Sequence, residues 1–487
     1  MLLNKSLLNL PFAVGILSLI IFSCTKPFSQ FVEERAQFAN LDDDYLRERI
    51  GDLNTIELSL DEAIEFALIH NLDLRVLQAQ LCLNSDAVQA ELIKMLPDIT
   101  YNSFNALRSN LLISSSTSVV PDVPPAPASF SSLRTTNTWT LEFSWDLLNA
   151  AIEYFNVKEA KYNVLSRELT YIRSAQDLIQ QVVTSYWQVA MLQGSAERLE
   201  ELTKISVDLA ERLRKQVDSG ALALQQATEV IGRIYYQQIQ AKQYLRNYQQ
   251  VKEQIKNLLG IPPEINLVLK IPEERTVPGA LPNPNDLHMI ALNYRPELYG
   301  IDVQMAISQD ELRKAILTLM PELTPFIDFA YDDNPFLMFS YWNTVGFRVV
   351  YHLLSIPTSF IAQKTAKDQM CVAYNQRLLT SIAVLSQIHV AYSLYEDARS
   401  RFLDAYIYWE AKKNSYELAL AKKNLNAIAD LDYVFPLSDL AYAETQKNLF
   451  YAEMMGYLEQ INNSIGIPRN FTENYNPKDI ETEEKQQ

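Results

Sequence analysis

Few side chains in this sequence stand at spacings that could carry out chemistry. No histidine has the spacing of a metal site; the four are His70, His288, His352 and His389. The three cysteines are too few and too scattered for a disulfide framework, and we expect Cys82 and Cys371 to be small buried side chains of helices. No Walker loop, GxSxG or HExxH motif occurs. The sequence therefore predicts no enzyme, with no catalytic residue, no metal site and no cofactor.

The third cysteine, Cys24, follows a segment with the form of an export signal. Residues 8–22 are an uncharged, mostly apolar run that is short for a spanning helix. The sequence Ile21-Phe22-Ser23-Cys24 resembles a bacterial lipoprotein cleavage box, whose cysteine thiol takes a diacylglycerol, although Phe22 is larger than the usual residue there. Thr25 is not the aspartate associated with inner-membrane retention. We expect a signal peptide at 1–23 and a lipid on Cys24; the alternative is an ordinary signal that contains a cysteine.

The overall composition favours long elements in an acidic protein. The 487 residues include 59 acidic and 42 basic side chains, a formal net charge of −17, and 48% are hydrophobic. Such an apolar share supplies a core and argues against disorder, and the acidic balance argues against nucleic-acid binding. Only 11 glycines occur, well below the usual share of roughly 7%, so few tight turns are expected.

The chain contains two copies of one pattern. The matching pairs of segments are 67–74 with 291–298, 94–100 with 318–324, 147–149 with 353–355, and 260–262 with 466–468. The first two pairs lie 224 residues apart and the last two lie 206 apart. Because several matches share two offsets, we infer an internal repeat. The first copy is longer by a loop, which we place at the Ser- and Pro-rich segment 114–132.

Each copy has the same predicted order: an opening helix, a strand pair, and a long helix that turns back into a shorter one. The first opening helix starts with the capping-box pattern Ser59–Glu62 and runs to about Met95. The long helices, about residues 150–217 and 358–424, measure roughly 100 Å each at 1.5 Å per residue. They end at the equivalent residues Gly220 and Asn426, two types that tolerate a left-handed backbone.

The predicted fold class is mainly α with a small β part, built from two internal repeats. In chain order the predicted segments are a signal peptide (1–23), an anchor segment (24–55), a first repeat (56–260) with strands at about 98–147 and a helical hairpin at 150–259, a Pro-rich linker (261–285), a second repeat (286–468) with strands at about 322–353 and a helical hairpin at 358–465, and an acidic mobile tail (469–487).

The second strand of each pair alternates apolar and polar side chains. The residues expected on the apolar face are Trp139, Leu141, Phe143, Trp145, Val345, Phe347, Val349 and Tyr351. Their aromatic content is typical of membrane barrels, and we expect this face to contact lipid; the alternative is a soluble sheet packed on a core. On the polar face Glu142 corresponds to Arg348. The first strands alternate less clearly, and Pro325 and Asp328 interrupt the one in the second copy.

The number of strands predicts self-association. Four strands cannot close a barrel, because small closed barrels need about eight, and open edges pair with other chains. Two chains supply eight strands and three supply twelve, and the strand count is compatible with either number. After the signal no run of eighteen apolar residues occurs, so we expect any membrane span to be β.

These features together resemble the TolC-like family of bacterial outer-membrane efflux channels. The resemblance covers about residues 56–470 and lies in the twofold repeat, the strand pairs, the long hairpins and the recurring Gly-Ile-Pro. It implies a homotrimer in which a twelve-stranded β-barrel in outer-membrane lipid continues as a twelve-helix α-barrel across the periplasm. It also implies two partners, a periplasmic adaptor (membrane fusion) protein and an inner-membrane pump.

The resemblance places a periplasmic gate at the hairpin turns, where such channels often carry a ring of aspartates. Asp432 is the best match, with Asp430 beside it and Asp218 at the other turn. A second acidic position of the family falls on Phe435, and Pro436 also departs from its pattern and is expected to lengthen the turn. The alternative is that Asp430 and Asp432 only cap the return helix.

The sequence favours a passive export duct powered by a partner. A second hypothesis is a surface-anchored structural or adhesion stalk in which the helices form a solid coiled coil. A solid stalk needs one buried seam, whereas apolar positions here are spread around the helices, as at Tyr235 and Tyr236. A third hypothesis, a periplasmic lipoprotein enzyme, needs a convergent polar site that the sequence does not offer.

Overall fold

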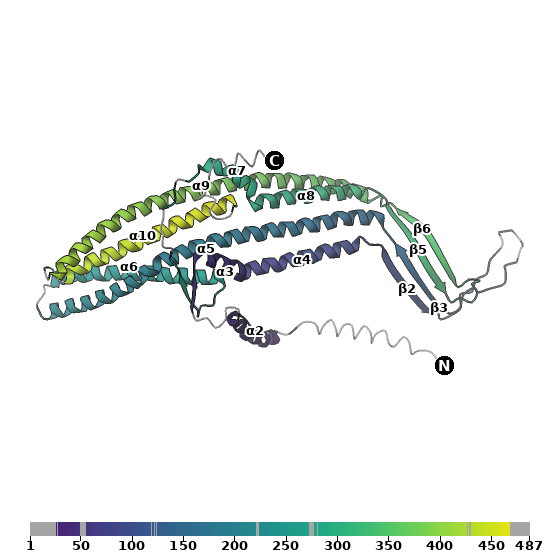
Figure 1. Cartoon of the computed structure of the whole chain (residues 1–487). Helices are drawn as coiled ribbons and strands as arrows, with labels where there is room; N and C mark the ends of the chain where they lie inside the picture. The colour runs from purple at the N-terminus through teal and green to yellow at the C-terminus, as the bar shows by residue number, and fades with distance from the viewer. Residues whose placement is uncertain are drawn as a thin grey trace. The chain divides into compact units, whose positions relative to one another are not determined.

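The computed structural model describes residues 26, 28–48, 55–117, 119, 120, 122, 124–220, 224–271, 277–279, 281–425, 427 and 430–467. Helices dominate these residues and strands form a small part (Figure 1). The elements are α2 (Phe28–Glu48), β1 (Thr55–Leu58), α3 (Leu60–His70), α4 (Leu72–Lys94), β2 (Asp98–Leu107), β3 (Thr135–Ser144), α5 (Leu147–Asp218), α6 (Leu224–Leu259), β4 (Asn266–Leu269), α7 (Pro284–Tyr294), α8 (Pro296–Leu317), β5 (Glu322–Asp332), β6 (Tyr341–Val350), α9 (Ser355–Asn424) and α10 (Asp430–Ile465).

The described residues fall into two compact units, and each unit draws on both repeats. The first unit lies within Met1–His70, Gln181–Arg275 and Ala405–Ala452. The second lies within Asn71–Gln180, Thr276–Asp404 and Glu453–Gln487. The helices α5, α9 and α10 each contribute to both units. With 72 and 70 residues, α5 and α9 have contour lengths of about 105 Å or slightly more.

Each predicted opening helix is in fact two helices. The capping box is confirmed: Ser59 N donates to Glu62 Oε2 at 2.7 Å, and Glu62 N donates to Ser59 Oγ at 3.4 Å. A single helix to Met95 was wrong, because Asn71 has an extended backbone and caps α4, its side chain accepting from Leu74 N at 3.1 Å. In the second copy Arg295 is the equivalent break, and a proline at the first position of α8 begins the new helix.

Arg295 holds the second unit together at this break. The side chain is 2% exposed, and Nη1 donates to the backbone oxygens of Asn463 and Ser464 at 2.9 and 3.3 Å. These are carbonyls of the last turn of α10, which have no partner within their own helix. The other nitrogen, Nη2, meets Glu297 Oε1 and Gln387 Oε1, both at 2.9 Å. Burial, the largest cause, lowers the pKa of the Arg295 guanidinium.

The second unit also contains the main sheet, four antiparallel strands in the order β2-β3-β5-β6 (Figure 1). The central pair joins the two repeats, since β3 belongs to the first and β5 to the second. Pro325 lies inside β5 without ending it. Its carbonyl accepts from Trp145 N at 3.2 Å, beyond the end of β3, so its missing N–H breaks no bond of the β3–β5 ladder. The strands β2 and β6 have open edges.

The first unit packs the ends of α5 and α10 against α6. One cluster contains Leu209, Ala210, Leu213, Ile234 and Val434, and a second contains Leu199, Leu202, Ala241 and Ala441. A short parallel pair, β1 with β4, adds Leu267 and Leu269 to the buried residues. This pair was not predicted from the sequence: β1 lies at the border between the expected anchor and the first repeat, and β4 lies in the expected linker. Each segment is only four residues long, so neither shows a clear period.

Two further expectations about the helices were wrong. Pro436 lies inside α10, which begins at Asp430, instead of lengthening the turn. Cys82 and Cys371 are exposed in the protomer instead of buried. Among the described residues one helical segment, Ile356–Asn424 in α9, is long and apolar enough to cross a membrane by length and composition, although it contains no run of eighteen apolar residues. Only 22% of its apolar window is buried.

Candidate functional site

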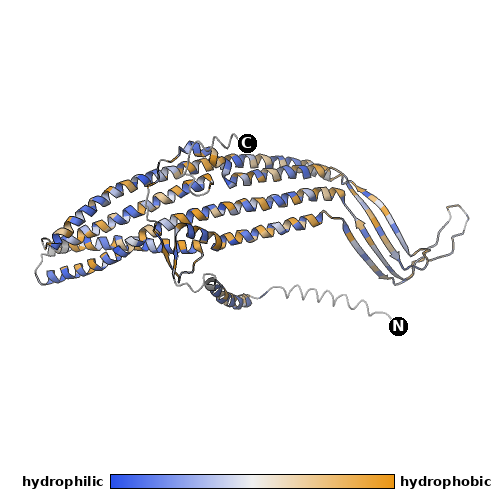
Figure 2. Cartoon of the chain, viewed as in Figure 1, coloured by the Kyte–Doolittle hydropathy of each residue, from blue (hydrophilic) through white to orange (hydrophobic). Residues whose placement is uncertain are grey.

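The four-stranded sheet separates apolar from polar side chains, and its register shows how. Paired residues share a face, and Phe143 of β3 pairs with Ile327 of β5, which pairs with Val345 of β6. The apolar face collects Ile99, Tyr101, Trp139, Leu141, Phe143, Leu323, Ile327, Phe329, Tyr331, Val345, Phe347 and Val349. Figure 2 shows the resulting alternation of hydrophobic and hydrophilic residues along the strands. The expected apolar residues of β3 and β6 therefore lie on one side of one sheet.

Aromatic rings stabilise this face across the strands. Trp139 stacks on Tyr331 with ring centroids 5.9 Å apart, and Tyr331 lies 4.7 Å from the ring of Tyr341. Phe143 meets Phe329 edge to face at 6.2 Å. Such cross-strand aromatic pairs contribute about 0.2–1 kcal/mol each. The pairs between β3 and β5 stabilise the register of two strands that are far apart in the sequence.

The apolar face is uncovered in the protomer. Val345 is 75% exposed and Phe347 is 73% exposed. Trp145 and Tyr351, which follow β3 and β6 directly, are also exposed, and the indole of Trp145 donates to Met95 O at 3.1 Å. A contiguous apolar surface of this kind is not stable in water. It needs either an apolar medium or a protein partner.

The opposite face of the sheet is polar and carries an acidic pair. Glu142 of β3 lies directly across from Asp328 of β5, and this row is completed by Thr100 and Thr344. Like charges opposite each other destabilise a sheet unless water or cations screen them. Arg348, the repeat equivalent of Glu142, pairs instead with Thr324, and its guanidinium lies 5.6 Å from the ring centroid of Phe326. This face is therefore suited to water.

The helical hairpins of the first unit carry the predicted turn and gate residues. The helix α5 ends at Asp218, which is exposed, and Gly220 has a φ of +73°, as a left-handed helix end requires. Asp432 is exposed near the start of α10. Asp430 is the first residue of that helix. Asn426 and the side chain of Asp430 lie outside the described residues, and so does Cys24.

Pro436 and Phe435 give the start of α10 an unusual geometry. A proline inside a helix has no N–H for the carbonyl four residues earlier, which here belongs to Asp432. The Asp432 carbonyl therefore accepts no helical hydrogen bond from position 436, and the carboxylate of the same residue is exposed. Phe435 packs against the Leu209 cluster, and the guanidinium of Arg233 lies 4.1 Å from its ring centroid. The position where the resemblance implies a second acidic ring is thus used for packing.

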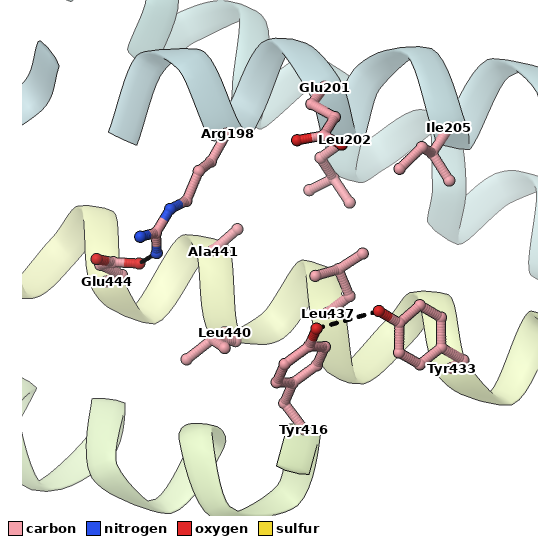
Figure 3. A pocket seen from close by; sticks show the side chains of 10 residues that line it. All are labelled: Arg198, Glu201, Leu202, Ile205, Tyr416, Tyr433, Leu437, Leu440, Ala441 and Glu444. Carbon is pink, nitrogen blue, oxygen red and sulfur yellow. Dashed lines mark hydrogen bonds and ion pairs between the residues drawn. The ribbon is translucent and has the colours of Figure 1, made fainter. Parts of the chain in front are cut away.

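A cavity of about 370 Å³ lies beside this part of α10 (Figure 3). It is lined by Arg198, Glu201, Leu202, Ile205, Tyr416, Tyr433, Leu437, Leu440, Ala441 and Glu444. The hydroxyls of Tyr416 and Tyr433 are 3.1 Å apart, and Arg198 forms an ion pair with Glu444. Burial, and after it the bond to Tyr416, raises the pKa of Tyr433 to about 12. This cavity could not be predicted from the sequence, because its lining comes from three helices.

Ion pairs tie α10 to its neighbours at the same level. Asp439 accepts from Lys412 of α9 at 2.8 Å and lies 3.8 Å from Arg233 of α6. The hydrogen bond with Asp439 is the largest cause that raises the pKa of Lys412. The arrangement contains no nucleophile held by a base, and among the described residues no group of three or more metal-ligating side chains occurs. The ion pairs of Asp439 position the start of α10 and, with it, Asp432.

Comparisons with known proteins agree with this architecture. Residues 63–261 match the family of outer membrane efflux proteins, a stretch that covers most of the first repeat. No curated protein matches the chain by sequence.

Solved structures match over most of the chain. The CmeC outer membrane channel of Campylobacter jejuni is 14% identical with a TM-score of 0.66, over 87% of this chain and 89% of that one. The outer membrane protein VceC of Vibrio cholerae is 14% identical with a TM-score of 0.60, over 84% and 96%. The open state of the MtrE outer membrane channel of Neisseria gonorrhoeae is 13% identical with a TM-score of 0.61, over 84% and 89%. At such identities the likeness concerns the fold.

Proposed function

We propose that this chain, which belongs to the outer membrane efflux protein family, is the outer-membrane channel of a tripartite efflux or secretion system. In this proposal three copies form a passive duct that spans the outer membrane and extends into the periplasm. The chain performs no catalysis of its own. An inner-membrane pump supplies the energy, and a periplasmic adaptor protein connects the pump to the duct.

The observation that carries the proposal is the sheet with one uncovered apolar face and two open edges. Strand edges of ten residues at β2 and β6 each leave backbone donors and acceptors unpaired, which lipid cannot satisfy. Pairing β6 of one protomer with β2 of the next satisfies both edges and closes a barrel. Three copies supply twelve strands, the number that the family resemblance implies.

Closure of the barrel places one face of the sheet against lipid and the other against water. The face with Val345 and Phe347 contacts lipid, where their exposure becomes favourable. The face with Glu142 and Asp328 lines a water-filled lumen, where the acidic pair is hydrated and screened. Ten- and eleven-residue strands match the roughly 9–11 residues that a tilted strand needs to cross a bilayer.

The helices support the same assembly. Apolar side chains of α9 that the protomer leaves exposed, including Leu379, Ile382 and Val390, form part of the surface that neighbouring protomers cover in an α-barrel. The same need for neighbours accounts for the apolar stretch of α9, which does not have to lie in lipid. Exposed Cys371 lies on this helix as well.

At the turns of the hairpins we propose an acidic gate formed by Asp432, with Asp218 and Asp430 as further candidates. Three converging copies of an exposed carboxylate favour cations and repel anions. The packing of Phe435 supports one ring at Asp432 over a pair of rings. Lipid attached to Cys24 anchors the chain to the outer membrane in the same proposal.

One experiment separates this function from the solid stalk. The full chain is purified in detergent, its oligomer mass is measured, and the same sample is added to a planar bilayer. We expect a trimer with discrete conductance steps. A monomer without conductance contradicts the assembly and the function together, whereas a trimer that never conducts favours the solid coiled coil.

A further inference from the structure

Two histidines that are far apart in the sequence meet in the second unit. His288 of α7 and His389 of α9 place their Nε2 atoms 3.0 Å apart, with ring centroids at 4.9 Å and an interplanar angle of 67°. We propose that they form a two-histidine site for a divalent late first-row transition metal, such as zinc or copper, that joins α7 to α9.

The separation of the two nitrogens suits one metal ion. Imidazole nitrogens bind zinc at about 2.0–2.1 Å, so two of them on one tetrahedral ion lie roughly 3.3 Å apart. The observed 3.0 Å needs only a small adjustment to reach that spacing. The rings also lie at a steep angle to each other, so they do not stack face to face and the edges that carry Nε2 stay directed toward each other.

Buried neighbours hold both ligands in place before any metal arrives. His288 follows Leu287 and His389 follows Ile388, and both of these hydrophobic residues have 0% exposure. One residue earlier in α9, Gln387 accepts from the buried Arg295 at 2.9 Å. Because each histidine follows a fixed backbone position, little conformational entropy is lost when the two rings share an ion.

The imidazole chemistry is also suitable. A neutral imidazole has one nitrogen without a proton, and that nitrogen can coordinate a metal. Throughout the described residues, no other hydrogen bond to either ring is formed. On binding, both rings carry their proton on Nδ1 and present the Nε2 lone pair to the metal, with no net release of protons from neutral rings.

The chemistry of the ligands sets the expected metals and strength. Imidazole suits zinc, nickel and copper, with copper bound most tightly. Within the parts of the chain that are described, no third metal-ligating side chain completes a cluster. Water therefore fills the remaining positions, and binding is weaker than at a structural site with four protein ligands. Without metal, the same contact is an N–H···N hydrogen bond, which accounts for the geometry but responds to no ion.

The test uses the purified full chain in detergent, stripped with a chelator and titrated with Zn²⁺ by calorimetry. We expect one ion per protomer and a loss of affinity of roughly tenfold or more in H288Q and in H389Q, by analogy with the effect of disturbing metal-site partners. Glutamine keeps an N–H donor near the original place, so these variants preserve a hydrogen bond while removing an imidazole. H352Q is the matched control, because His352 is also exposed but lies 3.3 Å from Glu322.

A second measurement counts the ligands directly. Electron paramagnetic resonance of bound Cu²⁺ should show two coupled imidazole nitrogens in the unaltered chain and in H352Q, and one in each single variant. Unchanged affinity and an unchanged spectrum in H288Q and H389Q would overturn the proposal, and so would the absence of Zn²⁺ binding to the unaltered chain. Neither the Zn²⁺ affinity nor the Cu²⁺ spectrum depends on conductance, so both outcomes are independent of the channel function.

Discussion

Replacing Val345 by arginine places a charge on the apolar face of the sheet. Val345 lies in the middle of β6, which runs from Tyr341 to Val350, and is 75% exposed in the protomer. If this face contacts lipid, the side chain lies near the centre of the bilayer. An arginine on the lipid face costs about 2–4 kcal/mol at that depth.

The assembly multiplies this cost. Three copies of V345R carry about 6–12 kcal/mol per trimer, comparable with the whole stability of a typical domain, about 5–15 kcal/mol. We therefore expect V345R to fold its helices but to insert poorly into lipid vesicles and to yield few conducting trimers. T344R is the matched control, since Thr344 is the adjacent residue on the polar face and lies across from Asp328. There the new charge is hydrated and faces a carboxylate.

The assay follows insertion of both variants into vesicles, with the urea dependence of unfolding in lipid and the helix signal of circular dichroism. The expected result is a loss of about 2–4 kcal/mol per protomer for V345R and less than about 1 kcal/mol for T344R. Equal losses in the two variants, or no loss in V345R, would show that the apolar face does not meet lipid. A helix signal lost in V345R alone would point to a folding defect, which the same variant in detergent reveals.

Three further predictions concern the gate, a helix end and the buried arginine. D432N should lower the ratio of cation to anion permeability in single-channel recordings, because it removes one carboxylate per protomer from the proposed gate. D208N, at an exposed site on α5, should leave this ratio unchanged. The same ratio in D432N and in the unaltered chain would exclude Asp432 from the gate. G466A should lower the free energy of unfolding by about 1–2 kcal/mol, because Gly466 has a φ of +75° and a Cβ there lies 3.1 Å from Tyr294 O. The control G194A, inside α5 with open space around it, should raise the free energy of unfolding by about 0.5–1 kcal/mol. Similar thermal melts for the two variants would contradict this prediction. R295M should lower the free energy of unfolding by about 3–5 kcal/mol, because the carbonyls at the end of α10 lose their donor, and R295K should lower it less. An unchanged melting temperature in R295M would refute the stabilising role of the contact between Arg295 and α10.

Local signals in the sequence were sufficient for most elements. The capping box at Ser59, the alternation in β3 and β6 and the long helices all follow from short-range periods and end signals, which act within a few residues. The internal repeat added an independent check, since each copy predicts the other. It also linked Gly260 with Gly466, which share a positive φ at equivalent helix ends.

The errors arose where a residue's neighbours override its local preference. Asn71 and Arg295 read as helix interior, yet a side-chain cap and a following proline divide the helix there. Pro436 reads as a helix break, yet packing of Tyr433 and Phe435 on both sides of a buried Val434 keeps α10 continuous. Cys82 and Cys371 were expected in the core because cysteine is usually a small buried side chain, but both are exposed in the protomer.

The sequence by itself determined the order and type of the long helices and of the main strands, and the two-faced character of those strands, because these depend on residues close together along the chain. It also showed the twofold repeat. Only the tertiary structure decided which partners meet: Glu142 with Asp328, Tyr416 with Tyr433, and His288 with His389. The members of these pairs are separated by 186, 17 and 101 residues, and a period along one segment carries no information about the segment it will face. The partner is selected by register and packing, which exist only after the chain has folded.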